Sequence, residues 1–296
     1  MPELPEVETI RGQLAPLVQG RRIERVEIRD PRWSRPLAPG ELAAALQGRR
    51  VQRLGRRGKY LVWELQGEVH LVQHLRMTGA ILAAADPEPA HTRVRMQLGP
   101  RRGARGGLAL AMVDPRRFGT GQLLAGGRAL DEFFAARLGL EPFDERFTDV
   151  HLRALTRGRT APIKALLLDQ RRIAGVGNIY ADEALFRAGV HPRMPAGRLS
   201  RDQASRLRTG LVEALSAGID ARGATIDDFR HVDGVHGSFQ DQFLVHRRAG
   251  EPCPRCGGLV EKMVVAGRGT YVCRRCQRPP RSASSPRSRA AQAASS

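Results

Sequence analysis

The feature that most constrains the fold is a change in the spacing of apolar residues near residue 129. Before that point, five segments alternate apolar and polar residues, and Gly and Pro clusters separate them. This alternation is typical of short strands with one buried face, and such a series without helices between its members predicts a β-sandwich. After residue 129 the spacing becomes helical. The five segments are RIERVEIR, VQRLGRRGKYLVWEL, VHLVQHL, HTRVRMQL and LALAMVD.

Helices are predicted on both sides of this region. Residues 5–18 carry apolar side chains at helical spacing, Pro5 suits the first turn, and Glu6 and Glu8 lie near the positive end of the helix dipole. Ser200 and Gln203 fit a capping box at the start of a long helix. The later helical segments are DEFFAARL, TDVHLRALT, TAPIKALLLDQ, IYADEALFRAG and LSRDQASRLRTGLVEALSAGI.

All four cysteines lie close together near the end of the chain. Their spacing is CxxC, sixteen residues, CxxC, which predicts one structural Zn²⁺ in a closed tetrahedral site. The alternatives are two disulfides or free thiols, and a cytosolic context disfavours persistent disulfides. The ligands would be Cys253, Cys256, Cys273 and Cys276. Between the pairs, VEKMVVAGRGTYV reads as two strands around a Gly-rich turn, where Arg268 either reaches into a groove or is simply solvated.

The chain is strongly basic, with 49 Lys+Arg against 30 Asp+Glu and a formal net charge of +19 over 296 residues. Such an excess favours a polyanionic partner, most often nucleic acid, although an arginine-rich proteome would also make a chain basic. No apolar run approaches the roughly 18–20 residues of a membrane span, and the acidic start is unlike a signal peptide, so we expect a cytoplasmic protein. The last stretch, RPPRSASSPRSRAAQAASS, has the composition of a disordered basic tail.

Four short motifs carry further candidates, each with a plainer alternative. In GVGNIYADEALF, free amides at a helix start would receive a phosphate, or Asn178 is an ordinary N-cap. Lys59 in RRGKY is a phosphate contact, a proton donor or a solvated lysine. In DPRRFGTG, Arg116 and Phe118 stack on or wedge between bases, or form a basic face and a core residue. Met77 in HLRMTG is a wedge or a core residue.

Six motifs together resemble the bacterial formamidopyrimidine-DNA glycosylases, which share a superfamily with endonuclease VIII. The resemblance covers residues 2–278, and the order and spacing of the motifs make it specific. The motifs are PELPEVET, RRGKYL, HLRMTG, DPRRFG, GVGNIYADEALF and the CxxC…GRGTYVCRRC end.

The resemblance implies a monomeric DNA-repair enzyme that clamps double-stranded DNA between two halves. It excises oxidised purines such as 8-oxoguanine and formamidopyrimidines, then cuts the strand at the abasic site. The implied α+β fold has an N-terminal β-sandwich with flanking helices, a helix–two-turn–helix module and a zinc-binding β-hairpin. The expected domains are 1–135 (catalytic sandwich), 136–242 (helical, DNA-binding), 243–278 (zinc finger) and 279–296 (basic tail).

The resemblance also implies roles for individual residues. Pro2, exposed by removal of Met1, would be the nucleophile and Glu3 the acid/base beside it. Lys59 would be a proton donor and phosphate contact in β-elimination, and Arg268 would act in δ-elimination. The other implied DNA-binding residues are His91, Arg116 and Arg159, the lesion-side residues Lys164 and Asn178, and Met77, Arg116 and Phe118, which fill the gap left by the extruded base.

Three positions depart from the family pattern. Val232 stands where the family often has serine in its lesion-sensing loop, and Arg76 stands where Gly is common. The stretch VHRRAGEPC before the cysteine site is closer to the endonuclease VIII style than to the usual VYGR. These departures concern the choice of base, so an endonuclease VIII-like activity on oxidised pyrimidines stays an alternative. A non-catalytic zinc-containing DNA-binding protein is the other alternative, although such a protein would not need Pro2 and Glu3 together.

An N-terminal proline suits this chemistry for two physical reasons. With an ordinary α-amino pKa of about 7.7–8.0, roughly one amine in ten is neutral at pH 7, against fewer than about one lysine in a thousand. A secondary amine also forms a permanently cationic iminium with the opened sugar, which favours elimination of the phosphates.

Overall fold

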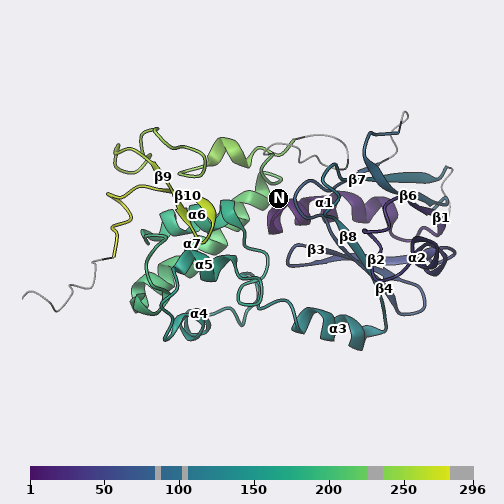
Figure 1. Ribbon diagram of the computed structural model, residues 1–296, viewed down its shortest axis with the longest axis horizontal. Coiled ribbons are helices and arrows are strands. Elements are labelled where there is room, and N and C mark those ends of the chain that lie inside the picture. The colour runs from purple at the N-terminus through teal and green to yellow at the C-terminus, as the bar shows by residue number, and fades with distance from the viewer. Residues whose placement is uncertain (84–87, 102–105, 226–231, 233–235, 281–296) are drawn as a thin grey trace, which may run out of the picture.

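The computed structural model describes residues 1–83, 88–101, 106–225, 232 and 236–280. Figure 1 shows two halves side by side, with the N-terminus between them. Residues 281–296 of the expected tail, and Asp233 and Gly234 of the expected lesion-sensing loop, lie outside the described residues.

The N-terminal half is a sandwich of two antiparallel four-stranded sheets, as predicted. One sheet has the order β1-β6-β7-β5 and the other β2-β3-β4-β8. Alternate strand residues face a shared core that contains Trp63, Leu71 and Met96. The strands are β1 (Ile23–Ile28), β2 (Val51–Arg57), β3 (Tyr60–Leu65), β4 (Val69–His74), β5 (Ala80–Ala83), β6 (Thr92–Leu98), β7 (Leu108–Val113) and β8 (Thr120–Ala125).

The expectation of strands without helices between them is wrong at one place. Helix α2 (Pro39–Leu46) separates β1 from β2, and it buries Leu42 and Leu46 on one face. The Glu41 carboxylate accepts a hydrogen bond from the Ala38 amide at 2.9 Å, which caps the helix start. Because PGELAAAL is short and rich in alanine, it has only these two strongly apolar positions and no long helical stripe.

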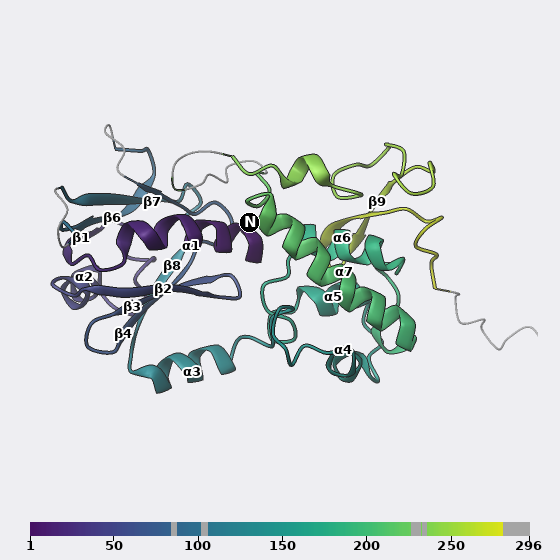
Figure 2. The same cartoon turned by 180° about the vertical axis from the view of Figure 1, so that it is seen from behind.

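Helix α1 (Leu4–Val18) joins the two halves, as Figure 2 shows from behind. Val7, Ile10 and Leu14 pack into the sandwich core. Leu4, at its first turn, belongs instead to the core of the helical half. The start of the chain is therefore held between the two halves.

The C-terminal half is helical and packs around α6 and α7. Its helices are α4 (Asp149–Thr156), α5 (Ile163–Leu168), α6 (Asn178–Ala188) and α7 (Arg201–Asp220), with 3₁₀ turns at Ala196–Arg198 and Phe239–Gln242. Helix α3 (Gly127–Ala135) lies on the sandwich instead, where Phe133 and Phe134 pack beside Val62 of β3 and Val72 of β4 (Figure 1). The predicted capping box at Ser200 and Gln203 is confirmed. Strands β9 (Glu261–Val265) and β10 (Arg268–Val272) form the predicted hairpin, which lies against α6. No helix in the described part of the chain is long and apolar enough to cross a bilayer.

Candidate active site

A cavity of about 570 Å³ lies where the two halves and the β9–β10 hairpin meet. Five of the residues singled out from the sequence line it: Glu3, Lys59, Met77, Asn178 and Arg268. They come from the N-cap of α1, the β2–β3 turn, the loop after β4, the start of α6 and the start of β10. The fold thus gathers residues that are up to 265 positions apart (Glu3 to Arg268, 268 − 3).

The N-terminus lies at the wall of this cavity. Met1 lines it and is half exposed, whereas Pro2 and Glu3 are buried. The Leu4 amide donates to the Gly175 carbonyl at 3.0 Å, which ties the start of α1 to the loop before α6. Removal of Met1 would place the Pro2 amine at this wall.

The Glu3 carboxylate occupies the amino end of α6. It accepts hydrogen bonds from the backbone amides of Ile179 at 3.0 Å and Tyr180 at 3.4 Å. Both sequence-based interpretations of the GVGN motif are therefore wrong for these amides. The anion that they bind is the Glu3 carboxylate and not a phosphate. The N-cap residue of α6 is Gly177 and not Asn178. A Cβ on Gly177 would lie 2.2 Å from Glu3 Cδ, so the glycine is required by the close approach of the carboxylate.

Glu6 fixes the position of Glu3 and of the N-terminus through three hydrogen bonds. Its carboxylate accepts from the Glu3 amide at 2.8 Å, the Tyr180 hydroxyl at 2.7 Å and the Ala224 amide at 2.8 Å. Burial, reinforced by the nearby Glu3 charge, raises the pKa of Glu6. The side chain therefore links α1, α6 and the segment after α7, and it mounts the N-terminus in the cavity.

Lys59 enters the cavity from the β2–β3 turn and is 4% exposed. Burial lowers the pKa of its ammonium, although Glu3 and Glu6 oppose that shift. Glu141 fixes the turn, because its carboxylate accepts from the Gly58 amide at 2.6 Å and pairs with Arg56 at 2.9 Å. A lysine held this way gives up its proton more readily than a solvated one.

Two loops beside the cavity carry exposed apolar side chains. Met77 is 40% and Phe118 is 48% exposed, so neither is the core residue of the plainer interpretation. Arg116 lies over the Phe118 ring, with its guanidinium carbon 4.9 Å from the ring centroid. Phe118 and Arg116 do not line the cavity itself. Exposed apolar residues on fixed loops suit insertion between base pairs.

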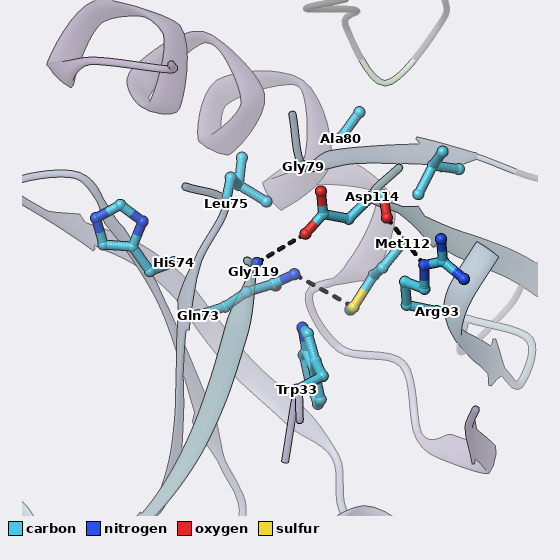
Figure 3. Close-up of a pocket in the computed structure, with 11 residues that line it drawn as sticks. Trp33, Gln73, His74, Leu75, Gly79, Ala80, Arg93, Met112, Asp114 and Gly119 are labelled. Atoms are coloured by element: carbon cyan, nitrogen blue, oxygen red, sulfur yellow. Dashed lines mark hydrogen bonds between the residues drawn. The ribbon is translucent and has the colours of Figure 1, made fainter. Parts of the chain in front are cut away.

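Asp114 fixes both loops. Its carboxylate accepts from the Thr78 hydroxyl at 2.5 Å and from the Gly119 amide at 2.7 Å. Figure 3 shows this carboxylate among the residues that line a small void, with a dashed line for the hydrogen bond from Arg93 to the Asp114 carbonyl. The void has a volume of about 10 Å³, and the hydrogen bond is 2.9 Å long. The void can hold at most one water, so it is too small to bind a substrate. The role of Asp114 is to stabilise the two loops.

Several residues that line the cavity had no role assigned from the sequence, among them His74, Gln170 and His246. His74 Nδ1 accepts from the Arg76 amide at 2.9 Å and so shapes the loop that carries Met77. Gln170 accepts from the Gly175 amide at 2.9 Å and donates to the Val176 carbonyl at 2.7 Å, which shapes the GVGN loop. The VHRR departure was the one signal for His246, whose ring nitrogen lies 2.9 Å from Asp182 Oδ2.

The other departures have clear structural settings. Arg76 has a φ of 57°, a left-handed conformation that glycine adopts without strain, which explains why glycine suits this position. Val232 is buried in the sandwich core, where its carbonyl accepts from the Ala83 amide at 3.1 Å and its amide donates to the Gln13 side-chain oxygen at 3.3 Å.

Arg268 projects from the start of β10 and is exposed along the cavity. The Asn178 amide donates to the Gly269 carbonyl at 2.9 Å, and its own oxygen is buried without a partner in the described residues. Lys164 differs from the expectation of a DNA contact. Its ammonium is fully buried and donates to Asp182 at 2.6 Å, Thr270 at 2.8 Å and Gly269 at 3.2 Å, so all three protons are used within the protein.

His91 and Arg159 lie outside the cavity. Both are exposed, on loops of the sandwich and of the helical half respectively. The Arg159 guanidinium donates to the Leu155 carbonyl at 2.9 Å. Their placement suits contact with a long ligand that extends beyond the cavity.

The four cysteine sulfurs form a metal site. All lie within 4.8 Å of one another, with Cys253–Cys276 at 3.8 Å and Cys256–Cys273 at 3.5 Å. Zn–S bonds of about 2.3 Å in a tetrahedron place sulfurs about 3.8 Å apart, whereas a disulfide requires about 2.05 Å. The cysteines therefore fit one structural Zn²⁺ and are not disulfide-bonded. Cys253 and Cys273 pack on Phe186 of α6, so the metal would hold the hairpin against that helix.

Three family models match this chain in order. They are the formamidopyrimidine-DNA glycosylase N-terminal domain over residues 1–121, the formamidopyrimidine-DNA glycosylase H2TH domain over residues 138–230, and the zinc finger found in FPG and IleRS over residues 250–279.

Curated proteins and solved structures agree with these matches. The formamidopyrimidine-DNA glycosylase of Bacillus licheniformis is 41% identical over 94% of this chain and 100% of its own length. That of Thermus thermophilus is 45% identical over 94% of this chain and 98% of its own length. The crystal structure of the Thermus thermophilus MutM (Fpg) protein superposes with a TM-score of 0.82, 44% identity and coverage of 93% and 98%. The Lactococcus lactis Fpg in complex with abasic-site DNA superposes with a TM-score of 0.86 and is 34% identical, and the match covers 94% of this chain and 100% of that one.

Proposed function

The chain belongs to the formamidopyrimidine-DNA glycosylase family, and on that ground we propose that it excises oxidised purines from double-stranded DNA and then cleaves the abasic site. The observation that carries the proposal is the cavity in which the N-terminus, Glu3, Lys59 and Arg268 meet. Duplex DNA with a damaged base is its partner, and the protein acts as a monomer with one structural Zn²⁺. Since its substrate is chromosomal DNA, we place it in the cytoplasm, associated with the nucleoid.

The first chemical step forms a bond between the Pro2 nitrogen and sugar C1′ while the bond from C1′ to the damaged base breaks, and the departing base takes up the proton that the Pro2 nitrogen loses. Glu3 supplies the proton that opens the sugar ring at O4′, which leaves an iminium between Pro2 and C1′. The buried position of Glu3 beside the N-terminus supports this role. General acid–base catalysis of this kind contributes about 10²–10⁴-fold.

Two eliminations follow from the iminium. Loss of the C2′ proton expels the 3′ phosphate, and Lys59, with its lowered pKa, is placed to serve this step. Loss of the C4′ proton then expels the 5′ phosphate, the step that we assign to Arg268. Water hydrolyses the iminium, releases the unsaturated aldehyde and restores the Pro2 amine.

Extrusion of the damaged base precedes this chemistry, because a stacked base cannot be reached. We propose that Met77, Phe118 and Arg116 fill the space that the base leaves. His91, Arg159 and Asn178 are the further DNA contacts of the proposal. The exposure of His91 and Arg159 supports their assignment. Asn178 lines the cavity, and beyond the N–H that it donates to the Gly269 carbonyl it has a second N–H to offer a phosphate.

Oxidised pyrimidines are the second candidate substrate. Two departures from the family pattern bear on the choice of base: His246 lines the cavity, and Val232 is buried in the sandwich core. A Lactococcus lactis Fpg structure contains DNA with an oxidised pyrimidine, so one fold of this family accommodates such a base.

A cleavage assay on matched duplexes tests the function. One duplex carries 8-oxoguanine opposite cytosine, one carries dihydrothymine, and an undamaged duplex is the control. We expect cleavage at 8-oxoguanine at least about tenfold faster than at dihydrothymine. The reverse order would favour the pyrimidine alternative, and cleavage of neither would refute the enzyme.

A further inference from the structure

We propose that Lys164 is a positioning residue: together with Asp182 and Thr270, it sets the backbone of Arg268 at the cavity and does not bind DNA itself. The inference rests on the role in δ-elimination that the proposed function gives to Arg268. In this inference Lys164 positions Arg268, in place of the phosphate contact that the resemblance implied for Lys164.

A continuous chain of hydrogen bonds carries the proposal. Asp182 Oδ1 accepts from Lys164 Nζ at 2.6 Å, and Lys164 Nζ donates to Thr270 Oγ1 at 2.8 Å. The Thr270 hydroxyl then donates to the Arg268 carbonyl at 2.9 Å. Because the hydroxyl proton can point to only one acceptor, the lysine that donates to its oxygen also directs that proton toward Arg268.

The next carbonyl of the strand is held as well. Gly269 O accepts from Lys164 Nζ at 3.2 Å and from Asn178 Nδ2 at 2.9 Å. Two consecutive carbonyls at the start of β10 are thus fixed from inside the protein, while the Arg268 side chain is exposed on the cavity side. In the described residues the Arg268 guanidinium has no hydrogen bond or ion pair of its own, so its direction depends on its backbone.

The burial of these groups excludes direct DNA contact by Lys164. Lys164, Asp182 and Thr270 are all 0% exposed, and Lys164 does not line the cavity. The second oxygen of Asp182 lies 2.9 Å from His246 Nδ1, so the same carboxylate also orients a cavity residue. Helices α5 and α6 are in this way connected through one buried ion pair to the hairpin that carries Arg268.

The proposal predicts a specific defect. Loss of the Lys164 ammonium should leave the Pro2 amine, Glu3 and Lys59 in place, since the hydrogen bonds of Lys164 go to Asp182, Gly269 and Thr270, and it acts on Glu3 only through its charge. Formation of the iminium and the first elimination should continue, whereas the second elimination should fall as it does when Arg268 is removed. A residue that bound the DNA itself would instead weaken every step.

The test uses the full-length protein and duplex DNA with a preformed abasic site under single-turnover conditions. The variants are Lys164→Met, Thr270→Val, Arg268→Ala and the two double variants with Arg268→Ala. Thr156→Val is the matched control, because Thr156 is 4% exposed and its hydroxyl donates to the Arg153 carbonyl at the same 2.9 Å, in α4. The readouts are the ratio of 3′-phosphate product to 3′-unsaturated aldehyde, the rate of the first elimination, and borohydride trapping.

We expect Lys164→Met and Thr270→Val to lower the 3′-phosphate share at least about fivefold, with the first elimination and trapping within about threefold of the parent. Neither change should add to the loss in Arg268→Ala, because both act through Arg268. Thr270→Val is nearly isosteric, so it keeps the test valid if Lys164→Met fails to fold.

Three outcomes would overturn the inference: an unchanged product ratio in Thr270→Val, a further loss on the Arg268→Ala background, or an equal change in Thr156→Val. An unchanged ratio of 3′-phosphate to 3′-aldehyde product in Arg268→Ala would refute the role of Arg268 in the second elimination, and with it this inference. It would not affect the proposed glycosylase activity. Failure of the parent protein to form a trapped adduct would instead refute the proposed function.

Discussion

The Glu3 carboxylate caps α6 through the Ile179 amide, 3.0 Å away, and this contact joins the first residues of the chain to a helix in the other half. A helix start favours a negatively polarised group, so the contact holds the carboxylate in a fixed position beside the N-terminus. It also sets the distance between the proposed nucleophile and the cavity wall, because Glu3 directly follows Pro2.

Gly177→Ala should impair catalysis although it removes no reactive group. The new Cβ would lie 2.2 Å from Glu3 Cδ, and the φ of −131° at this position is acceptable for alanine, so the effect comes from displacement of Glu3. We expect at least about a tenfold loss in 8-oxoguanine excision at a small cost in stability. Gly127→Ala is the control, since nothing lies within 4 Å of its Cβ and it is in a helix. Equal activity of Gly177→Ala and the parent would contradict the role of this contact.

Met77→Ala and Phe118→Ala should affect excision of a damaged base more than cleavage of a preformed abasic site. Both side chains are exposed, so their loss costs little folding energy, and extrusion of a base requires a few kcal/mol that an abasic sugar does not. We expect about a tenfold or greater loss for 8-oxoguanine and less than about threefold for the abasic duplex. Asp114→Asn should weaken both loops at once, because its carboxylate holds each of them. Equal losses on the two substrates would point to simple DNA binding.

Stability should fall in mild acid because of His74. Burial, with the charges of Arg76 and Lys59, lowers the pKa of His74 to about 3, against an ordinary value of 6.5. In this pH range the unfolded chain therefore binds a proton at His74 that the folded protein does not bind. The free energy of unfolding falls as the pH drops from about 6.5 toward 3. Between pH 7 and pH 5 this amounts to about 2 kcal/mol, at 1.36 kcal/mol per pKa unit.

His74→Gln is the variant that isolates this effect, since glutamine keeps an acceptor for the Arg76 amide. Denaturant unfolding at pH 7 and pH 5 measures the free energy of unfolding of both proteins. The parent should lose about 2 kcal/mol more than the variant over this interval. An identical pH dependence of the two proteins would refute a neutral, buried His74.

The sequence predicted individual helices, strands and motifs better than the contacts between residues that are far apart in the chain. The strands that alternate clearly, the helix at the N-terminus and the cysteine site formed as expected, because each depends on residues that are close in the chain. Asp114 and Glu141 gave no such signal, since their partners Thr78 and Gly58 are 36 and 83 positions away. Lys164 was misread for the same reason: nothing local shows that Asp182 and Thr270 would occupy its protons.

The GVGN motif illustrates a further limit. Its glycines suggested a phosphate site, a reasonable inference from backbone chemistry alone. The structure places Glu3 there, and the glycines make room for Glu3 and Leu4. A motif can predict an anion at a helix start without showing that the anion belongs to the protein.

Removal of zinc should selectively disable the hairpin. We expect about one zinc per chain by elemental analysis and loss of the metal with a strong chelator. Because Cys253 and Cys273 pack on Phe186, the apo protein should lose the docking of β9–β10 on α6, with more than about a tenfold loss in DNA binding and the loss of the 3′-phosphate product. Restoration by Zn²⁺ is the control. A metal-free protein with full activity would contradict a structural zinc.

We propose that the Pro2 amine is the nucleophile, and borohydride trapping followed by peptide mass analysis identifies the attacking residue. The protein, produced without an N-terminal tag, is incubated with duplex DNA that carries 8-oxoguanine opposite cytosine. The account predicts that Met1 is absent, that one DNA strand is attached to Pro2, and that Pro2→Gly no longer yields this proline adduct. An adduct on Lys59 or another lysine, or a trapped protein that retains Met1, would contradict it.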